Sequence, residues 1–510
     1  MATANLTSDA VRVTEAQSRA RWWMPSLTDV FFLAVIFTLF LSDPAGWDRL
    51  VWDGDTGLHT RTGDWVLDHH SVPTTDPFSF TRPGQRWFAF QWLSGVVFAL
   101  LNRWVGLKGI VLLAGVLIAA TFLVMLRNML FRGANGLVSM LLVLLAGNAM
   151  SIHFHARPHI FTLFFLAIAQ YQIARDMKKP TPAFWLIVPM TLVWANMHSG
   201  FPVVLATLGL LVAGCSIQAL TGKSTWIPVK RYAIALVLCC AATLINPNGF
   251  ELYRHISQFL NNPWILQHID EYQPPVFHSE AMYYFLAILF AALVAVRPMI
   301  DRQQWPEILW ILVFGAGSLV SARHGPIFLV VATPFVAVEL SDLMARAVQW
   351  QGPKSVIAML QSVADGASSC LRPVSVWSGV AVLAIAIFST TFPADLSAKY
   401  FPRDMVNRHA DELASAHVFT TDQWGDYLLW KNYPRQKVFM DGRSDFYQES
   451  LGDEYLQVAS AGDDWRQDLA KYDVNVALIP NDIRLANALR LDAGWQLVDQ
   501  DKQSLLFRRR

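Results

Sequence analysis

Apolar stretches of nearly the length of a membrane helix recur along this chain of 510 residues and limit its fold more than any other feature. A membrane-spanning helix needs roughly 20 mainly apolar residues, with about 17 as a lower limit. Eleven stretches reach or approach this length once the polar residues beside them are included. We therefore expect a polytopic α-helical membrane protein with about eleven spans. The stretches are residues 27–41, 110–126, 136–150, 160–173, 183–194, 202–217, 232–244, 282–296, 308–320, 326–340 and 376–389.

Composition agrees with a membrane chain and argues against other classes. Hydrophobic residues make up 54% and charged residues only 15%, against about a quarter charged residues in soluble globular proteins. The net charge of +1 gives no reason to expect a nucleic-acid partner. The four cysteines lie in or beside apolar segments without metal-ligand spacing, so a disulfide framework is not expected. The polar first 26 residues precede an apolar run without a small-residue cleavage site, which indicates a retained anchor.

A further apolar stretch at residues 90–104 either spans the membrane or lies in its surface as an amphipathic helix. The positive-inside rule decides between the two. If the stretch does not span, every short basic loop falls on the side of the N-terminus; if it spans, the next loops invert and the pattern fails. We therefore expect a surface helix here, a cytoplasmic N-terminal segment 1–26 and a transmembrane domain 27–390. The inside residues are then Arg12, Arg19, Arg21, Arg127, Arg132, Arg175, Lys178, Lys179, Lys223, Lys230, Arg231, Arg297, Arg302, Arg346, Lys354 and Arg372.

Three large pieces are expected on the outer side, together with all 13 histidines. They are a first loop at residues 42–107, a second long loop at residues 246–280, and a tail at residues 391–510. The tail has about the length of a small domain with its own core. We expect it to be an extracytoplasmic α/β domain. Its strand-like runs are residues 437–440, 474–479, 496–498 and 504–507, and a helical pattern surrounds residues 482–491.

The first loop carries two carboxylates one residue apart, Asp53 and Asp55, just beyond the first span. Such a carboxylate can take a proton from an attacking hydroxyl group. The pair can also share a divalent cation, which prefers oxygen ligands. The simpler alternative is that one of the two aspartates caps the helix that follows.

Two further turns place polar side chains at outer helix ends. Residues 151–159 hold His155, Arg157 and His159, in which imidazoles can ligate a metal and the arginine can hold a phosphate. Alternatively, these groups satisfy one another and lipid headgroups in an interfacial turn. Arg323 lies between two spans, where an arginine is costly unless it is paired or snorkels. Phosphate is the natural partner of its guanidinium fork. In the tail, Asp441 and Arg443 either pair with each other or help the tail to dock.

The first loop resembles the GT-C class of membrane glycosyltransferases, in its Asp53-x-Asp55 opening with His59 and Gly63 and in the later run Val72-Pro73-x-x-Asp76-Pro77-Phe78-Ser79. That class includes protein mannosyltransferases, the aminoarabinose transferase of lipid A and the catalytic subunit of oligosaccharyltransferase. The likeness extends loosely over residues 27–340 and points to a bacterial branch with a soluble C-terminal domain. It implies interfacial helices in the first loop, a polyprenyl-phosphate-linked sugar donor, and inverting transfer on the outer face.

The resemblance also implies roles for single residues. Asp55 or Asp53 is then the catalytic acid of the first loop, and Arg323 faces the lipid phosphate together with Arg157. Further candidates for substrate or phosphate binding are His59, Arg61, His155 and His159.

Several members of the class hold a divalent cation through acids of the second outer loop. In this chain the second outer loop is the turn at residues 151–159, which has histidines and Arg157 but no acid. A Mg²⁺ or Mn²⁺ site would therefore have to come from Asp53, Asp55 and His155. No other cofactor is expected.

The function expected from this reading is transfer of a sugar from a polyprenyl phosphate to a hydroxyl group of a cell-envelope glycan, lipid or protein. The expected location is the bacterial inner membrane. Two other classes stay open: a transporter or flippase for a lipid-linked or polar solute, and a non-catalytic scaffold or sensor. Few charges lie in the middle of the spans, which favours an enzyme at the outer surface over a transporter.

Overall fold

The computed structural model describes residues 23–40, 46–368, 370–372, 374–388, 392 and 394–510. Most of the expected N-terminal segment, with Arg12, Arg19 and Arg21, lies outside the described residues. The start of the first loop at 42–45 and the expected domain boundary at 390/391 also lie outside them.

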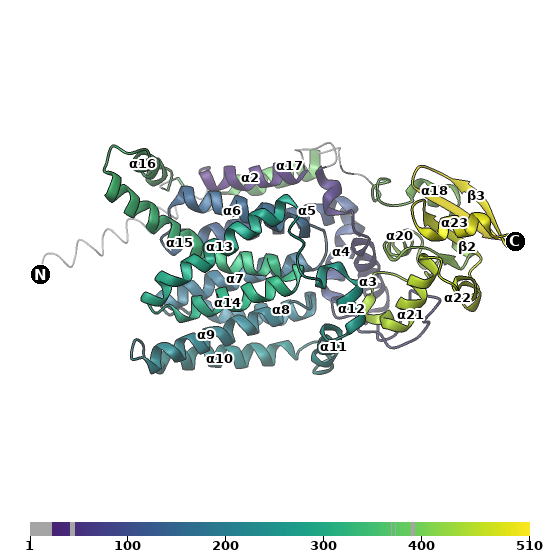
Figure 1. Ribbon diagram of the computed structural model, residues 1–510, viewed down its shortest axis with the longest axis horizontal. Coiled ribbons are helices and arrows are strands. Elements are labelled where there is room, and N and C mark those ends of the chain that lie inside the picture. Colours follow the sequence, from purple (N-terminus) through teal and green to yellow (C-terminus); the bar gives the residue numbers. More distant parts are fainter. Residues whose placement is uncertain (1–22, 41–45, 369, 373, 389–391, 393) are drawn as a thin grey trace, which may run out of the picture.

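Each of the eleven apolar stretches coincides with a helix, and Figure 1 shows these helices side by side as a bundle. Six described helices are long and apolar enough to cross a membrane, and the others are shorter or more polar. The chain is therefore a multi-pass membrane protein, while the count of eleven spans stays a prediction. The helices are α2 (Leu27–Phe40), α5 (Leu107–Phe131), α6 (Gly136–Met150), α7 (His159–Lys178), α8 (Ile187–Met197), α9 (Pro202–Leu220), α10 (Trp226–Thr243), α13 (Glu280–Asp301), α14 (Trp305–Val320), α15 (Gly325–Gln351) and α17 (Val376–Phe388).

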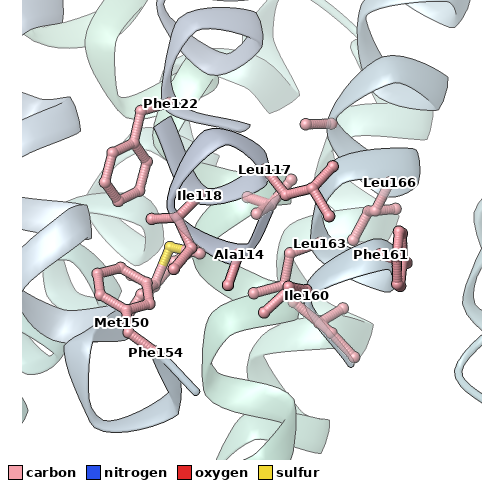
Figure 2. Packing of buried hydrophobic residues seen from close by; sticks show 14 of the residues in the cluster. Ala114, Leu117, Ile118, Phe122, Met150, Phe154, Ile160, Phe161, Leu163 and Leu166 are labelled. Atoms are coloured by element: carbon pink, nitrogen blue, oxygen red, sulfur yellow. The ribbon is translucent and has the colours of Figure 1, made fainter. Parts of the chain in front are cut away.

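The bundle is held by a continuous apolar core. Figure 2 shows part of it, where Ala114, Ile118 and Phe122 of α5 lie near Met150 at the end of α6 and Ile160 of α7. All five are buried. Since lipid tails are as apolar as leucine, close packing rather than exclusion from water orders such helices, and small residues assist this packing.

Figure 1 also shows a helix that the sequence did not predict, α16 (Val356–Ser368), at the end of the bundle away from the tail.

Both long loops form helices at the end of the bundle that faces the tail (Figure 1). The first loop contains α3 (Asp55–His69) and α4 (Trp92–Val105). The two pack at backbone contact, because a Cβ added to Gly63 would lie 1.9 Å from the carbonyl oxygen of Gly95. In α4, Phe98 is fully buried whereas Trp104 is 76% exposed, which is the two-faced pattern expected of the stretch at 90–104. The second long loop contains α11 (Glu251–Leu260), α12 (Pro263–His268) and the 3-10 turn η4 (Asp270–Tyr272).

The tail is an α/β structure built on a four-stranded sheet with the strand order β1-β2-β4-β3. Strands β1 (Val418–Phe419) and β2 (Val476–Pro480) are parallel, and β4 (Ser504–Arg509) runs antiparallel to both β2 and β3 (Trp495–Gln500). The alternating runs in the sequence thus mark β2, β3 and β4 and the helix α23 (Arg484–Leu491). The other helices of the tail are α18 (Arg403–Arg408), α19 (Ala410–Ser415), α20 (Asp422–Asn432), α21 (Ser444–Ala459) and α22 (Trp465–Lys471).

The prediction of a strand at residues 437–440 is wrong in one respect, because this run does not join the four-stranded sheet. Val438 instead pairs with the first loop: its N–H donates to the carbonyl of Phe78 (3.1 Å), and the N–H of Phe80 donates to its carbonyl (3.0 Å). The strand-like composition of this run therefore reflects pairing of the tail with the first loop.

A buried ion pair joins the tail to the first loop beside this pairing. Arg443 Nη1 lies 2.8 Å from Asp76 Oδ1, and Arg443 also bonds Asp441 (2.6 and 2.7 Å). The side chain of Arg443 is 4% exposed and that of Asp76 is 0% exposed. The rings of Phe78 and Trp87 lie against the guanidinium. Arg443 thus pairs within its own turn and docks the tail as well.

We expect Arg443→Ala to destabilise the protein by about 3–5 kcal/mol, because it leaves the buried carboxylates of Asp76 and Asp441 without their counter-charge. Asp76→Asn is expected to destabilise it less, because Arg443 keeps its pair with Asp441. Thermal unfolding and protease sensitivity of the tail in detergent measure this effect. The matched control is Arg435→Ala, which removes an exposed pair with Asp411 and is expected to change stability by about 0–1 kcal/mol. Equal effects of buried and exposed variants would contradict the docking role.

Candidate active site

A polar cavity opens where the first loop, the second long loop and the tail meet. It is named here the acidic cavity, because carboxylates from all three segments line it. Its lining includes Asp53, Asp55, His59, Arg157, Asp270, Glu271, Tyr272, Arg323, Asp422, Gln423 and Asp445. The side chains that the sequence singled out at 53, 55, 157 and 323 therefore converge, although they lie on three distant segments.

Arg157 is the centre of this convergence. Its guanidinium lies 2.9 Å from Asp53 Oδ2, 2.6 Å from Asp55 Oδ2 and 2.8 Å from Glu271 Oε1. The surrounding carboxylates raise the pKa of Arg157 well above its usual value, although burial alone would lower it. One cation thus compensates three acids in a largely buried place, where unpaired charges would be costly.

Arg323 shares the acid of the second long loop with Arg157. Its Nη1 lies 3.0 Å from Glu271 Oε2 and donates to the hydroxyl oxygen of Tyr272 (2.8 Å). Burial would raise the pKa of Glu271, but Arg157 and Arg323 outweigh it and hold that pKa well below its usual value. Arg323 Nη2 faces His198 Nε2 at 3.4 Å. Arg323 is therefore paired, which offsets the cost of an arginine between two membrane spans.

The two aspartates of the first loop have different environments. Asp53 Oδ1 accepts the N–H of Asp55 (2.9 Å), which starts α3, so Asp53 satisfies a helix-start donor while Arg157 takes its other oxygen. Burial raises the pKa of Asp55 to about 7, although Arg157 opposes the rise. An acid with this pKa can accept and release a proton near neutral pH. Asp53 thus holds the start of α3, whereas Asp55 has the pKa of a group that can exchange a proton near neutral pH.

The histidines near the cavity are neutral rather than cationic. Burial and the nearby Arg157 lower the pKa of His59 to about 3, and burial lowers the pKa of His155 to about 4. His155 does not line the acidic cavity, and its Nδ1 lies 3.9 Å from Asp53 Oδ2. His159 lines the neighbouring pocket, and its Nε2 lies 2.6 Å from the carbonyl oxygen of His153. These rings can take part in hydrogen bonds, but they do not bring positive charge to a phosphate.

Arg61 lies away from the site that the resemblance implied for it. It lines neither the acidic cavity nor its neighbouring pocket. Its Nε donates to the carbonyls of Leu429 (3.1 Å) and Trp430 (2.9 Å), and its Nη1 pairs with Asp64. With about 3.6 residues per turn, a position six residues beyond Asp55 points to another face of α3. Arg61 therefore holds α3 to α20 of the tail.

An apolar pocket adjoins the acidic cavity and extends between bundle helices. Its lining includes Leu163, Val203, Ile256, Phe259, Leu260 and Ile327. Glu271, Tyr272 and Arg323 line both the apolar pocket and the acidic cavity. The arginine thus stands where an apolar environment changes to a polar one.

The residues of the cavity do not fit a divalent cation. Among the described residues, no group of three or more His, Cys, Asp or Glu side chains is arranged to hold a metal ion. Asp53, Asp55 and His155 form no such group, and the oxygens of Asp53, Asp55 and Glu271 that point to a common centre are taken by the guanidinium of Arg157. A metal would need the space and the ligands that Arg157 already uses.

Replacing Arg157 is therefore expected to create cation binding. We expect Arg157→Ala to bind Mn²⁺ measurably, because three carboxylates lose their shared counter-charge, while the wild-type protein does not. Electron paramagnetic resonance of added Mn²⁺ measures this without any activity assay. Arg435→Ala, which removes an exposed arginine of the tail, is the control. Tight Mn²⁺ binding at this cavity in the wild-type protein would contradict the assignment.

Several residues of the site were not selected from the sequence. Glu271 was visible only as half of an acidic pair in the second long loop. Asp422 and Asp426 belong to α20, where Asp426 is fully buried beside the equally buried Tyr427 and Leu428. A charged residue inside an apolar helical pattern is the signal that could have marked Asp426.

Several solved membrane-protein structures have a similar fold. The oligosaccharyltransferase AglB from Archaeoglobus fulgidus, solved with an inhibitory peptide and a dolichol-phosphate, has a TM-score of 0.55 and 10% identity over 89% of this chain and 69% of its own. The apo form of the A. fulgidus oligosaccharyltransferase has a TM-score of 0.53 and 11% identity over the same shares. ArnT from Cupriavidus metallidurans, bound to undecaprenyl phosphate, has a TM-score of 0.41 and 15% identity over 94% of this chain and 97% of its own.

The likenesses to the two A. fulgidus structures confirm the fold that the GT-C resemblance implied: a polytopic helical membrane domain with a C-terminal α/β region. At such low identity they establish the fold alone. No family model matches the chain, and no curated protein matches its sequence.

Proposed function

We propose that this protein is a membrane glycosyltransferase that moves a sugar from a polyprenyl-phosphate donor to an acceptor hydroxyl group. The observation that carries the proposal is the position of Arg323 at the boundary between the apolar pocket and the acidic cavity. The apolar pocket suits an isoprenoid chain and the acidic cavity suits a sugar. A phosphate that links the two would lie at the guanidinium, which matches phosphate geometry.

In this mechanism Asp55 is the general base and the reaction is a single displacement. The acceptor oxygen attacks the first carbon of the sugar, its proton passes to Asp55, and the bond from that carbon to the phosphate oxygen breaks. The configuration at the sugar carbon inverts. A pKa of about 7 suits this role, because about half of the carboxyl groups are ionised near neutral pH and the carboxylate is basic enough to take a proton.

The departing polyprenyl phosphate carries the electron pair of the broken bond. Arg323 stabilises the growing negative charge, since Nη2 can turn from the weak 3.4 Å contact with His198 to a phosphate oxygen. Arg157 contributes a second positive charge from within the carboxylate cluster. His59 lines the sugar side of the cavity as a neutral hydrogen-bonding group.

The charge pattern of the loops supports a reaction at the outer membrane face. The positive-inside pattern puts the two long loops and the tail opposite the basic loops, so the acidic cavity opens away from the cytoplasm. AglB, which shares the fold, was solved with a dolichol-phosphate, itself a polyprenyl phosphate. The proposed location is the bacterial inner membrane, and the acceptor is a glycan, lipid or protein of the cell envelope.

The test uses purified protein in detergent, undecaprenyl phosphate as the binding probe, and a panel of radiolabelled undecaprenyl-phosphate hexoses and pentoses with cell-envelope fractions as acceptors. We expect Asp55→Asn to lower transfer by about 10²- to 10⁴-fold and to keep undecaprenyl phosphate binding. Arg323→Gln is expected to weaken that binding. Full activity in both Asp53→Asn and Asp55→Asn would contradict the assignment. Binding without transfer by the wild-type protein would favour the transporter or scaffold alternatives.

The same base predicts a pH dependence. Because burial raises the pKa of Asp55 to about 7, the carboxyl group is protonated below that pH and cannot accept the proton of the acceptor. We expect kcat/KM to rise with pH up to about 7 and to fall roughly tenfold per pH unit well below it. Transfer rates from pH 5 to 9 measure this limb. A rate that stays constant between pH 5 and 7 would contradict an Asp55 base.

A further inference from the structure

Helix α20 of the tail packs directly against the start of α3, the helix that begins at Asp55. The N–H of Gly54 donates to the side-chain oxygen of Gln423 (2.7 Å). A Cβ added to Gly54 would lie 2.4 Å from the carbonyl oxygen of Gln423, and one added to Gly57 would lie 2.7 Å from Cβ of Trp430. The two glycines thus allow the backbones to approach more closely than side chains would permit.

This contact brings a second carboxyl group next to Asp55. Asp426 of α20 is fully buried, and its Oδ1 accepts the N–H of Gly442 (3.0 Å). A Cβ added to Gly442 would lie 2.3 Å from Asp55 Oδ1 and 2.8 Å from Asp426 Oδ2. The two carboxyl groups are therefore close enough for a direct contact or one bridging water. Asp426 Oδ2 is buried and has no hydrogen-bond partner among the described residues.

Two such groups cannot both carry a charge at this separation in a buried place. Asp55 faces the cation Arg157, whereas Asp426 has no ion pair with any described residue and lies near the further acids Asp422 and Asp441. Burial, and then the charge of Asp55, raise the pKa of Asp426 well above its usual value. Near neutral pH the charge therefore belongs to Asp55 and the proton to Asp426.

We propose that Asp426 is a positioning residue that donates a hydrogen bond to Asp55, directly or through one water, and so orients the catalytic carboxylate from the tail. The inference rests on the proposed function, because it assigns a role relative to the base. Asp426 does not touch substrate, being fully buried behind Asp55. The tail then supplies part of the catalytic apparatus and does more than cover it.

The test compares Asp426→Asn with Asp426→Ala in the transfer assay. Asparagine keeps an acceptor for Gly442 and a donor for Asp55, so we expect wild-type kcat. Alanine removes both, so we expect kcat to fall about 10- to 100-fold while KM for the polyprenyl-phosphate sugar stays within about twofold. Binding of undecaprenyl phosphate alone should be unchanged in both variants.

A second variant separates the two carboxyl groups without removing either of them. Gly442→Ala places a methyl group between the two carboxyl groups, and we expect kcat to fall as in Asp426→Ala. The matched control is Thr81→Val, which removes another hydrogen bond between the first loop and the tail, from Thr81 to the carbonyl of Phe439 (2.6 Å). It should weaken docking without lowering kcat. Thermal unfolding and protease sensitivity report docking in each variant.

The outcomes separate the two proposals. Absence of transfer by the wild-type protein overturns the proposed function and this inference with it. Equal transfer by the wild-type protein and Asp55→Asn overturns the role of Asp55 as the base, and with it this inference. If Asp55→Asn is inactive but Asp426→Ala and Gly442→Ala keep wild-type kcat, only the positioning role is overturned. The role also fails if Asp426→Asn is as slow as Asp426→Ala, or if Thr81→Val lowers kcat equally.

Discussion

The contact of one guanidinium with three carboxylates organises the site on which the rest of the structure depends. Arg157 comes from the turn after α6, Asp53 and Asp55 from the first loop, and Glu271 from the second long loop. Each charge alone would be costly where it lies, so the segments are stable only together. Because Glu271 also pairs with Arg323, the same network extends to the turn between α14 and α15. The geometry on which the proposed function rests thus comes from the mutual neutralisation of these buried charges.

The tail belongs to this solution as well. Its Arg443 is neutralised partly by Asp76 of the first loop, and its α20 lies in backbone contact with the start of α3. The acidic cavity therefore has no complete wall without the tail, whose Asp422, Gln423 and Asp445 line it. A mobile accessory domain would not need a buried ion pair and glycine-mediated contact at its junction. We regard the first loop and the tail as one structural unit set on the end of the bundle.

The guanidinium of Arg157 also explains why a site rich in acids does not fit a divalent metal ion. Three carboxylates that converge are the usual description of a divalent metal site, and composition alone cannot tell which cation neutralises them. Here the counter-charge is covalently part of the chain. An arginine brings fixed donors in a plane, whereas a metal would bring open coordination positions, so the proposed mechanism uses proton transfer and charge stabilisation by side chains alone.

What the sequence determined by itself was the location of the helices and of the polar groups that are costly among them. Apolar length marked the eleven helices that coincide with the predicted stretches, though not α16, and the basic loops predicted a surface helix at residues 90–104, because both signals are local in the chain. Asp53, Asp55, Arg157 and Arg323 stood out because charge beside a membrane helix needs a reason. Only the tertiary structure decided that these four meet, that Glu271 joins them, that Arg61 turns away to hold α20, and that Asp426 reaches Asp55 from more than 350 residues along the chain. Such pairings depend on long-range packing and on two glycines that admit a close approach, and neither leaves a periodic trace in the sequence.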